Sequence, residues 1–320
     1  MTSGLSTFEV VSPGILTSVQ DLGRFGSARL GVAPSGTLDG YAARAANLVA
    51  GNAETAAVLE TTLMGLRLRA LRETVVAVTG GDLQPRLSAA ELPMWRSQRV
   101  KEGEVIAFSG PRSGFRAYVA VAGGFDVDPV MGSRATNLAS GFGGFKGRLL
   151  RKGDILPAAP VDNLPDRLNR VCPPEVVPVY SAPWNLRVVW GPQGDQFMDA
   201  GKRTFVSAVY TVSPDSDRTG IRLKGARIDR LPGVGDSIIS EGIISGAIQV
   251  PGDGQPIIIL GETASGGYRK IATVISADLP LLGQITPGDE VTFTAVSMHA
   301  AIAALREIQG RLDTLRRSLA

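Results

Sequence analysis

The chain has 320 residues, of which 44% are hydrophobic and 20% are charged, and its formal net charge is only +3. This composition fits a packed globular protein with room for two domains. It lacks the clustered basic face and stacking aromatics of a nucleic-acid-binding protein. The single cysteine, Cys172, and the single histidine, His299, exclude an internal disulfide and a zinc site built from these residue types.

The scarcity of histidine also limits the chemistry. Because His299 lies near the C-terminus, far in sequence from any glycine-rich motif, a nucleophile paired with histidine is not expected. Acid–base work therefore falls to Asp, Glu, Lys or Tyr. Residues 1–9 lack the basic segment and apolar run of a signal peptide, and no stretch approaches 18 apolar residues. We expect a cytoplasmic protein that does not span a membrane.

A polar phrase follows the first apolar strand. It places Gln20, Asp21 and Arg24 within five residues, next to Gly23. A strand end that feeds a tight loop is a usual place for functional side chains. The alternative is a solvated loop with a local Asp–Arg pair.

A helix is predicted over 39–50. Thr37 or Asp39 can cap its start, and Gly51 follows its last residue. The phrase that begins at Ser35 therefore opens a helix N-terminus, whose free amides can bind a carboxylate or a phosphate. Plain capping explains the same residues equally well.

Short apolar runs closed by glycines predict two buried strands, over 74–79 and 116–122. The first strand leads into Gly80, Gly81 and Asp82. The glycines would let a ligand approach the backbone, and Asp82 could then bind that ligand or act as a base. A hairpin turn is the alternative.

The segment 140–148 is rich in glycine and carries Lys146 and Arg148. It lacks the hydroxyl residue that follows the lysine in a P-loop, and no helix signal flanks it. A loop whose amides and Arg148 hold an anion would account for it, and so would a glycine hairpin.

Prolines mark a boundary between the two halves of the chain. Seven of the twenty prolines fall between Pro157 and Pro183, which predicts an extended linker. We expect a first domain over 1–160, a linker over 161–184, a second domain over 185–296 and a C-terminal helix over 297–320.

The second half repeats the texture of the first, with strands predicted over 186–190, 257–260 and 291–294. Gln249 lies at the end of a further short strand that the sequence predicts. A glycine pair then stands among polar residues, in the order Glu262, Gly266, Gly267, Tyr268 and Lys270.

The C-terminal segment predicts an amphipathic helix with an apolar stripe at three- and four-residue spacing. The helix could dock on its own domain or form a contact between subunits. The stripe consists of Leu305, Ile308, Leu312, Leu315 and Leu319.

Nine such phrases occur in order between about residues 8 and 296, and together they carry a resemblance. They include Thr17–Arg24, Ser35–Asp39, Thr79–Asp82, Gly132–Arg134 and the phrase that ends at Tyr268. The chain resembles the family of the 5-oxoprolinase C subunit. That family is also labelled biotin-dependent carboxyltransferase, allophanate hydrolase subunit 2, or antagonist of the KipI kinase inhibitor.

The resemblance implies a mainly β fold of two cyclophilin-like β-barrel domains in one chain, with few helices. It implies ATP-dependent hydrolysis of 5-oxo-L-proline to L-glutamate, together with the A and B subunits of the 5-oxoprolinase complex, of which the B subunit is KipI-like. The chain departs from the family pattern at three places. Gly81 replaces an alanine, Arg269 replaces a proline, and the loop over 261–269 is one residue shorter, with Glu262 in place of an aspartate.

Polar loop tips from both barrels are expected to converge around an anionic small molecule. The candidate catalytic residues are Asp21, Asp82, Arg134 and Lys270. The candidates for binding substrate or nucleotide are Gln20, Arg24, Ser35, Asp39, Arg148, Arg218, Gln249, Gly266, Gly267 and Tyr268. Positive charge around a moving phosphoryl group would come from Arg24, Arg134, Arg148 and Arg218. Metal or proton work would fall to Asp21, Asp39 and Asp82. ATP is expected to be shared with the complex, Mg²⁺ is a candidate ion, and zinc is not expected.

Two other functions fit the same resemblance. One is a component of a biotin-dependent carboxyltransferase, although the lysine motif of a biotin carrier does not occur in this sequence. The other is a regulator that binds a KipI-like kinase inhibitor without catalysis.

Overall fold

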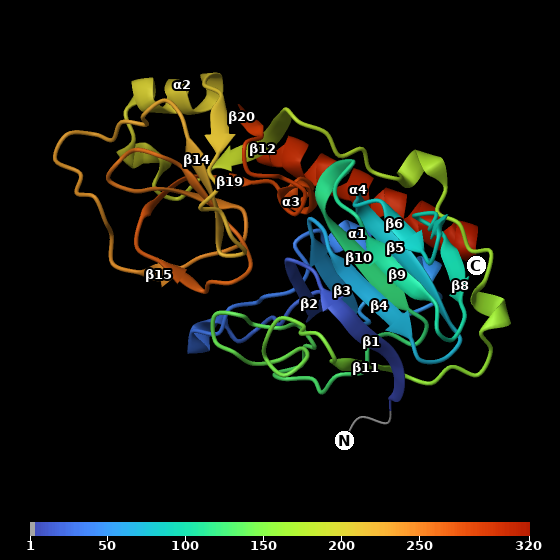
Figure 1. The fold of residues 1–320 in the computed structure, drawn as a ribbon. Coiled ribbons are helices and arrows are strands. Elements are labelled where there is room, and N and C mark those ends of the chain that lie inside the picture. Colours follow the sequence, from blue (N-terminus) through green and yellow to red (C-terminus); the bar gives the residue numbers. More distant parts are fainter. Residues whose placement is uncertain (1–3) are drawn as a thin grey trace. The chain divides into compact units, whose positions relative to one another are not determined.

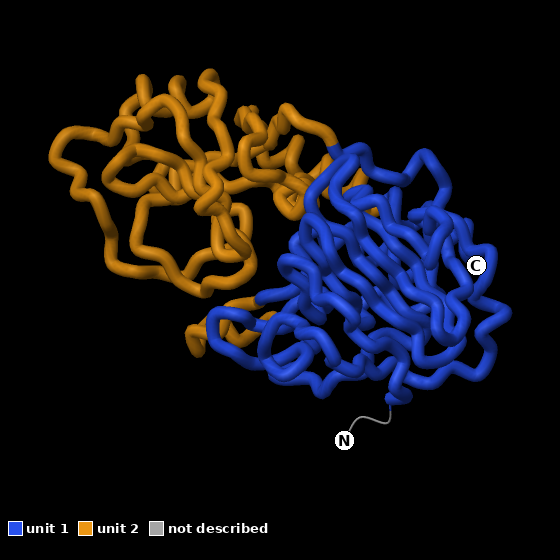
Figure 2. Tube along the Cα trace, in the orientation of Figure 1, with its two compact units in different colours: residues 1–24, 35–180, 310–320 blue, residues 25–34, 181–309 orange. Residues whose placement is uncertain are grey.

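The structure is a computed structural model that describes residues 4–320. The prediction that residues 1–9 are not a signal peptide therefore lies partly outside the described residues. The chain divides into two compact units (Figure 2). The first contains the residues up to Arg24, Ser35–Tyr180 and Gly310–Ala320, and the second contains Phe25–Pro34 and Ser181–Gln309. The main division falls inside the segment predicted as a linker.

The first unit is built from two sheets (Figure 1). One sheet has the order β11 (Ile155–Ala158), β1 (Leu5–Pro13), β4 (Leu66–Ala70), β9 (Val105–Phe108), β6 (Pro85–Leu87) and β7 (Ala90–Glu91). The other has the order β2 (Leu16–Gln20), β3 (Val58–Thr62), β10 (Ser113–Val121), β5 (Thr74–Asp82) and β8 (Ser97–Val100).

The core of the first unit takes side chains from both sheets, such as Phe8 and Leu68 from one and Leu59 and Val119 from the other. The opposite face of the five-stranded sheet is covered by α1 (Gly40–Val49), which buries its alanines against Ala77, Tyr118 and Ala120. A strand that is covered on both faces needs apolar residues at every position. This explains the unbroken apolar run that β5 shows in the sequence.

The proline-rich segment is held along the first unit up to Tyr180. Its 3₁₀ turns are η2 (Pro165–Arg167) and η3 (Pro174–Val176). Tyr41 Oη donates to the carbonyl of Val176 at 2.6 Å, and Arg167 Nη1 donates to the carbonyl of Gly51 at 2.6 Å. These bonds make the segment a part of the first unit's surface, which differs from the free extended linker that the prolines suggested.

The single cysteine lies in this segment. Cys172 is buried, with 3% of its surface exposed. Burial raises the pKa of its thiol to about 12. The reactive thiolate is therefore scarce at neutral pH.

The second unit is a closed β-barrel (Figure 1). Its strands, in barrel order, are β12 (Trp184–Trp190), β19 (Arg269–Val274), β16 (Ala247–Val250), β17 (Ile257–Ile259), β14 (Gly220–Lys224), β13 (Tyr210–Val212) and β20 (Glu290–Ala295). A separate two-stranded sheet pairs β15 (Glu241–Gly242) with β18 (Ser265–Gly266). The remaining elements are η1 (Ala28–Leu30), η4 (Gly194–Gln196), α2 (Asp199–Ser207) and α3 (Leu279–Leu282).

A C-terminal helix is present as predicted, as α4 (Met298–Leu319). Leu312 and Leu315 are buried, and Leu315 packs into the alanine-rich cluster of the first unit. Ala304 and Ile308 belong to an apolar cluster of the second unit. Three positions of the apolar stripe, Ile308, Leu312 and Leu315, are thus packed within the chain. No helix among residues 4–320 is long and apolar enough to cross a membrane.

The prediction of a mainly β fold is confirmed. Each of the five strands predicted with a residue range overlaps an observed strand, and the largest differences are at β5, which continues to Asp82, and at β10, which begins at Ser113. The helix α1 lies inside the predicted helix. The second unit closes into a barrel by its hydrogen bonds, whereas the strands of the first unit form two sheets.

A buried polar network joins α1 to the five-stranded sheet. Asp39, which is fully buried, caps α1 by accepting a bond from Ala42 N at 2.8 Å, and it accepts a second bond from Tyr180 Oη at 2.7 Å. The main-chain N–H of Asp39 donates to Tyr118 Oη, which in turn donates to Glu60 Oε2. Burial first, and then the nearby Asp39, raise the pKa of Tyr180 well above its usual value.

We predict that Asp39→Ala lowers the free energy of unfolding by about 2–4 kcal/mol, because it removes a helix cap and leaves the hydroxyl of Tyr180 without its acceptor. Asp39→Asn keeps an oxygen for Ala42 N and should cost less. Urea unfolding of the full chain measures both variants. Equal midpoints for Asp39→Ala and the parent chain would contradict this role.

A second pair closes the turn before β11. Arg148 Nη1 and Nη2 bind the two oxygens of Asp154 at 2.7 and 2.8 Å, and Asp154 also accepts a bond from Arg151 N. The side chain of Asp154 is 9% exposed and that of Arg148 is 24% exposed. The hydrogen bond from Arg148 lowers the pKa of Asp154.

Because this bidentate pair is partly buried, we predict that Arg148→Ala costs about 1–3 kcal/mol at pH 7. A carboxyl whose pKa is lowered by folding stabilises above its unfolded pKa of about 4, so the cost should shrink as the pH falls below that value. Urea unfolding at pH 7 and pH 3 tests this. Arg99→Ala is the control, because the Arg99–Glu73 pair is half exposed at 3.7 Å and is worth less than about 1 kcal/mol. Equal effects of the two variants would refute the prediction.

Candidate functional site

Several predicted residues of the first unit meet at the end of β2. Asp21 Oδ1 accepts bonds from Gly23 N at 2.8 Å and Ser133 Oγ at 2.7 Å, and its Oδ2 accepts a bond from Arg134 N at 2.5 Å. Both carboxylate oxygens are therefore used to hold two loops together. The structure brings Asp21 and Arg134 side by side, and Asp21 has a structural task there.

Gln20 ties a third loop to this place. It is fully buried, and its Nε2 donates to Ser18 Oγ and to the carbonyl of Thr136. Its Oε1 accepts a bond from Gly36 N, the residue after Ser35. Ser35 itself is buried with a left-handed φ of 54°. Sequence reasoning thus found residues that do lie together, in a cluster that organises loops.

Arg24 is 2% exposed and is held inside the same region. Its Nη2 donates to the carbonyl of Ala135 at 2.7 Å, and its guanidinium lies 4.7 Å from the centre of the Phe142 ring. A Cβ at Gly143 would stand 2.3 Å from the oxygen of Ala135 and 2.8 Å from Arg24 Nη2. The glycine-rich segment therefore needs Gly143 in order to pack over Arg24.

Asp82 does not join this cluster. Asp82 lies opposite Ser113 on β10, whereas Asp21 follows Gln20 at the level of Val121 on the same strand. Eight residues of strand separate the two levels, which is about 25 Å. Asp82 forms an exposed ion pair with Arg112 at 3.0 Å. The expected convergence of Asp21 and Asp82 is therefore corrected, because the sheet register places them at opposite ends of the strands.

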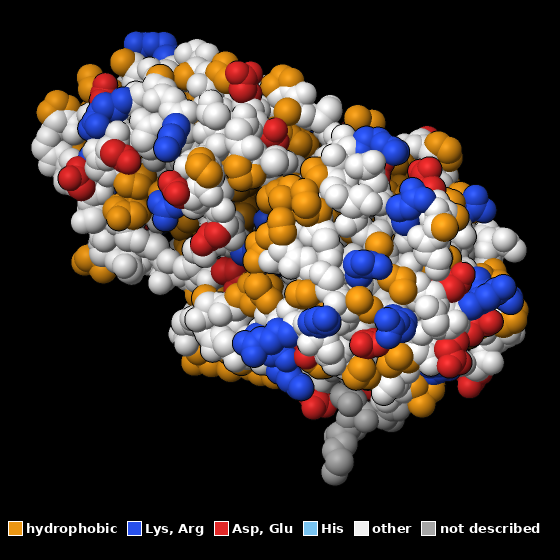
Figure 3. Space-filling model, viewed as in Figure 1, with side chains coloured by type: hydrophobic (Ala, Val, Ile, Leu, Met, Phe, Trp, Pro, Cys, Tyr) orange, Lys and Arg blue, Asp and Glu red, His pale blue; other side chains and the backbone are white. Residues whose placement is uncertain are grey.

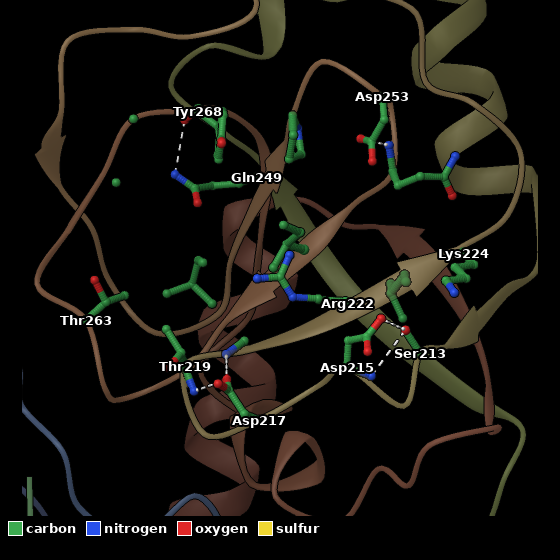
Figure 4. Close-up of a pocket in the computed structure, with 18 of the residues that line it drawn as sticks. Ser213, Asp215, Asp217, Thr219, Arg222, Lys224, Gln249, Asp253, Thr263 and Tyr268 are labelled. Atoms are coloured by element: carbon green, nitrogen blue, oxygen red, sulfur yellow. Dashed lines mark hydrogen bonds between the residues drawn. The ribbon is translucent and has the colours of Figure 1, made fainter. Parts of the chain in front are cut away.

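A pocket lies in the second unit (Figure 4). Its cavity volume is about 630 Å³, and it opens over the outer face of β14, β17 and β16. Four predicted binding residues line it, namely Gln249, Gly266, Gly267 and Tyr268. This is the place where sequence prediction and cavity coincide, so we take it as the candidate site.

The floor of the pocket follows from strand alternation. On β14 the residues Ile221 and Leu223 face the barrel core and are buried, so Arg222 and Lys224 face outwards into the pocket. Ile257 and Ile259 of β17 lie on the same outer face and form a small apolar cluster with Ile243 and Ala247. The floor thus combines cationic and apolar side chains.

Gln249 and the glycine pair form one wall. Gln249 is 4% exposed, and its Nε2 donates to the carbonyl of Tyr268 at 3.2 Å. A Cβ at Gly266 would stand 2.4 Å from Gln249 Nε2, so a side chain there would displace the amide of Gln249. The side chain of Tyr268 lies at the rim and is partly exposed.

Lys270 supports this wall from behind. It is 5% exposed, and its Nζ lies 2.6 Å from Glu241 Oε1, an oxygen that also accepts a bond from Gln193 Nε2. The bond from Lys270 lowers the pKa of Glu241. Since Glu241 pairs with Gly266 in the two-stranded sheet of β15 and β18, Lys270 anchors the strand pair that carries the wall. A catalytic role for Lys270 stays a prediction.

Two other residues that the sequence singled out in the second unit are engaged inside the fold. Arg218 Nε lies 3.2 Å from Glu262 Oε1, and both side chains are buried. Arg269, the departure from the family proline, binds the carbonyls of Gly235 and Ser237 and the side chain of Gln196. The shortened loop is thus stabilised by internal bonds.

Sequence reasoning did not name as site residues five charged residues that line the pocket, although Asp217 and Arg222 stand in the phrases that carry the resemblance. Arg222 and Lys224 could have been found from the alternation of polar and apolar residues along 220–224. The other three are Asp215, Asp217 and Asp253. They follow no such pattern, because they stand in turns whose positions depend on the barrel. Within the described part of the chain, no group of three His, Cys, Asp or Glu residues lies close enough together to hold a metal ion.

Charged side chains of both signs are interspersed over the face shown in Figure 3. The pocket likewise carries charges of both signs. Its lining contains two cations and three carboxylates, a formal charge of −1.

Comparison with known proteins places the chain in a family. The carboxyltransferase domain family, subdomains A and B, matches residues 30–295. The chain is 35% identical over 312 residues to the C subunit of 5-oxoprolinase from Escherichia coli strain K12, and the match covers 96% of this chain and 97% of that protein. It is also 35% identical to the urea amidolyase of Lachancea kluyveri, over 96% of this chain but 18% of that protein.

A solved structure agrees. The urea carboxylase of Kluyveromyces lactis matches 99% of this chain and 30% of its own chain, with a TM-score of 0.91 at 33% identity. These matches confirm the resemblance that the ordered polar phrases carried. The chain therefore belongs to the carboxyltransferase domain family, in which it is similar along nearly its whole length to the C subunit of 5-oxoprolinase.

Proposed function

We propose that the chain is the C subunit of a 5-oxoprolinase complex, which hydrolyses 5-oxo-L-proline to L-glutamate at the expense of ATP in the cytoplasm. The observation that carries this proposal is the near end-to-end match to the C subunit of 5-oxoprolinase, which extends over 97% of that protein. The equally identical urea amidolyase is matched over 18% of its length. The partners are the A and B subunits of the complex, of which the B subunit is KipI-like.

The reaction needs activation because amide resonance makes a lactam a poor electrophile. In the proposed sequence, the γ-phosphoryl group of ATP moves to the lactam oxygen and ADP leaves. Water then adds to the lactam carbonyl carbon, and the ring C–N bond breaks as the nitrogen takes a proton. A second water releases phosphate from the resulting acyl phosphate. Positive charge and fixed geometry around the phosphoryl group would lower the barrier.

Arg134 is the arginine best placed for this task among the four that the sequence suggested. Arg24, Arg148 and Arg218 are used inside the fold by carbonyls, Asp154 and Glu262 respectively. The side chain of Arg134 is 41% exposed and lies 3.9 Å from Asp126, while its Nε donates to the carbonyl of Val127. Because Nη2 forms only this long contact among the described residues and the side chain is partly exposed, the guanidinium can still reach a ligand. A role for Mg²⁺ also stays a prediction.

A second candidate function is carboxyl transfer from carboxybiotin. It is favoured by the structural match to the urea carboxylase of K. lactis over nearly the whole chain. That function would require a biotinylated carrier and a biotin carboxylase as partners. A third outcome, tight binding to a KipI-like partner without catalysis, would mark a regulator.

We predict that the chain mixed with the A and B subunits hydrolyses ATP only when 5-oxo-L-proline is present, and that omitting the chain abolishes glutamate formation. Coupled detection of ADP and of glutamate measures both products. A parallel assay with carboxybiotin and urea tests carboxyl transfer. Carboxyl transfer without 5-oxoproline-dependent ATP turnover would overturn the proposal.

We also predict that Arg134→Ala lowers the turnover of this complex by about a hundredfold or more, because it removes a charge that would stabilise the phosphoryl group in transit. The matched control is Arg69→Ala, which removes a half-exposed arginine paired with Glu9 in the same unit. Circular dichroism and the unfolding midpoint check that both variants fold. Full activity of Arg134→Ala would remove Arg134 from the site.

A further inference from the structure

Three residues of the pocket stand in one row across neighbouring strands. Arg222 on β14 lies directly opposite Ile257 on β17, and Ile257 lies directly opposite Gln249 on β16. Residues that face each other across strands project from the same side of a sheet. Neighbouring strands lie about 4.8 Å apart, so Arg222 and Gln249 flank Ile257 with about 10 Å between their backbones. That spacing leaves room for a small ring over Ile257.

The charges of the pocket are not equivalent. Asp217 accepts bonds from Thr219 N and Gly220 N, and Asp253 accepts one from Gln255 N. Asp215 Oδ2 accepts a bond from the hydroxyl of Ser213. Each carboxylate thus has a local donor in its own turn (Figure 4).

The two cations of the pocket have no carboxylate beside them. Across residues 4–320, neither Arg222 nor Lys224 is within ion-pair distance of a carboxylate. Arg222 carries a planar fork of donors that matches a carboxylate in two parallel bonds, which a lysine cannot do. In Figure 4 the guanidinium of Arg222 reaches over the centre of the strands, whereas Lys224 lies to one side near Ser213. Arg222 is therefore the anchor available for an anion.

The amide of Gln249 has a defined orientation. Its Nε2 donates to the carbonyl of Tyr268, so its Oε1 is left to accept a hydrogen bond. An acceptor in this position suits an N–H group of a ligand. Between this acceptor and Arg222, the side chain of Ile257 offers an apolar surface for methylene groups.

The formal charge of the lining selects among anions. Two cations and three carboxylates sum to −1, which opposes the entry of a polyanion such as a nucleotide triphosphate. A ligand with a single carboxylate can bind Arg222 at a smaller electrostatic cost. The pocket therefore favours small monocarboxylates over nucleotides.

We propose that this pocket binds a cyclic amide that bears one carboxylate. Arg222 binds the carboxylate, Gln249 Oε1 accepts the ring N–H, and Ile257 contacts the ring. The assignment rests on the proposed function for the choice of 5-oxo-L-proline as the probe. It also separates substrate binding in the second unit from nucleotide binding, which it places outside this pocket.

Titration calorimetry of the full chain with 5-oxo-L-proline tests the assignment. Arg222→Gln should weaken binding about ten- to a hundredfold, the usual effect of losing a hydrogen bond to a charged group. The control Arg203→Gln, an exposed residue of α2 that does not line the pocket, should bind like the parent chain. Two further ligands are informative, namely 2-pyrrolidone, which lacks the carboxylate, and L-proline, which lacks the lactam carbonyl and carries a charged nitrogen. Both should bind at least tenfold more weakly than 5-oxo-L-proline to the parent chain.

The same variants in the reconstituted complex separate this inference from the proposed function. Arg222→Gln should raise KM for 5-oxo-L-proline while leaving KM for ATP unchanged. If KM for 5-oxo-L-proline is unchanged, the inference falls and the proposed function stands. If the complex shows no ATP-dependent turnover but the chain still binds 5-oxo-L-proline through Arg222, the proposed function falls and the binding site stands. Binding of 5-oxo-L-proline that neither Arg222→Gln nor removal of the carboxylate weakens would overturn the inference.

Discussion

Main-chain hydrogen bonding in the barrel is the constraint on which the candidate site depends. The ladder between β14, β17 and β16 aligns Arg222, Ile257 and Gln249 across three strands. Side chains alternate between the two faces of a sheet, so a shift of one residue would turn all three into the barrel core. Closure of the barrel leaves the strands no free edge along which to slip. The backbone register therefore determines which positions face the pocket. The residue types at these positions can change while the positions themselves stay fixed.

The first unit uses polar residues in a different way. Its buried and half-buried carboxylates and amides connect loops to one another, as the half-buried Asp21 does between the β2 end and Ser133, and as the buried Asp39 does between α1 and Tyr180. A buried polar group is costly unless it is hydrogen-bonded, and a fully bonded one fixes the groups around it. Polar phrases that look functional in the sequence can therefore be the joints of a scaffold, and here several of them are.

Local patterns in the sequence are sufficient to predict the helices and strands. They are insufficient to predict which residues the individual side chains contact. Apolar runs predict β5 and β10, and a cap followed by alanines predicts α1, because these signals are local. The engagement of Arg218 by Glu262, 44 residues away, depends on tertiary packing that no local pattern reveals. Asp82 and Asp21 look alike in the sequence because both end strands, but the antiparallel order sends those strands in opposite directions. Arg222 is within reach of sequence reasoning, since its alternation with apolar neighbours on β14 marks an outward face.

The enclosed thiol of Cys172 has a practical consequence. Its raised pKa and its burial within the first unit shield it from alkylating reagents for as long as that unit stays folded. The chain has no other cysteine, so a thiol-specific label that attaches reports a single event, the opening of the first unit around this residue. The rate at which Cys172 is labelled therefore measures local unfolding of the first unit. A bound partner or ligand that stabilises this unit would lower that rate.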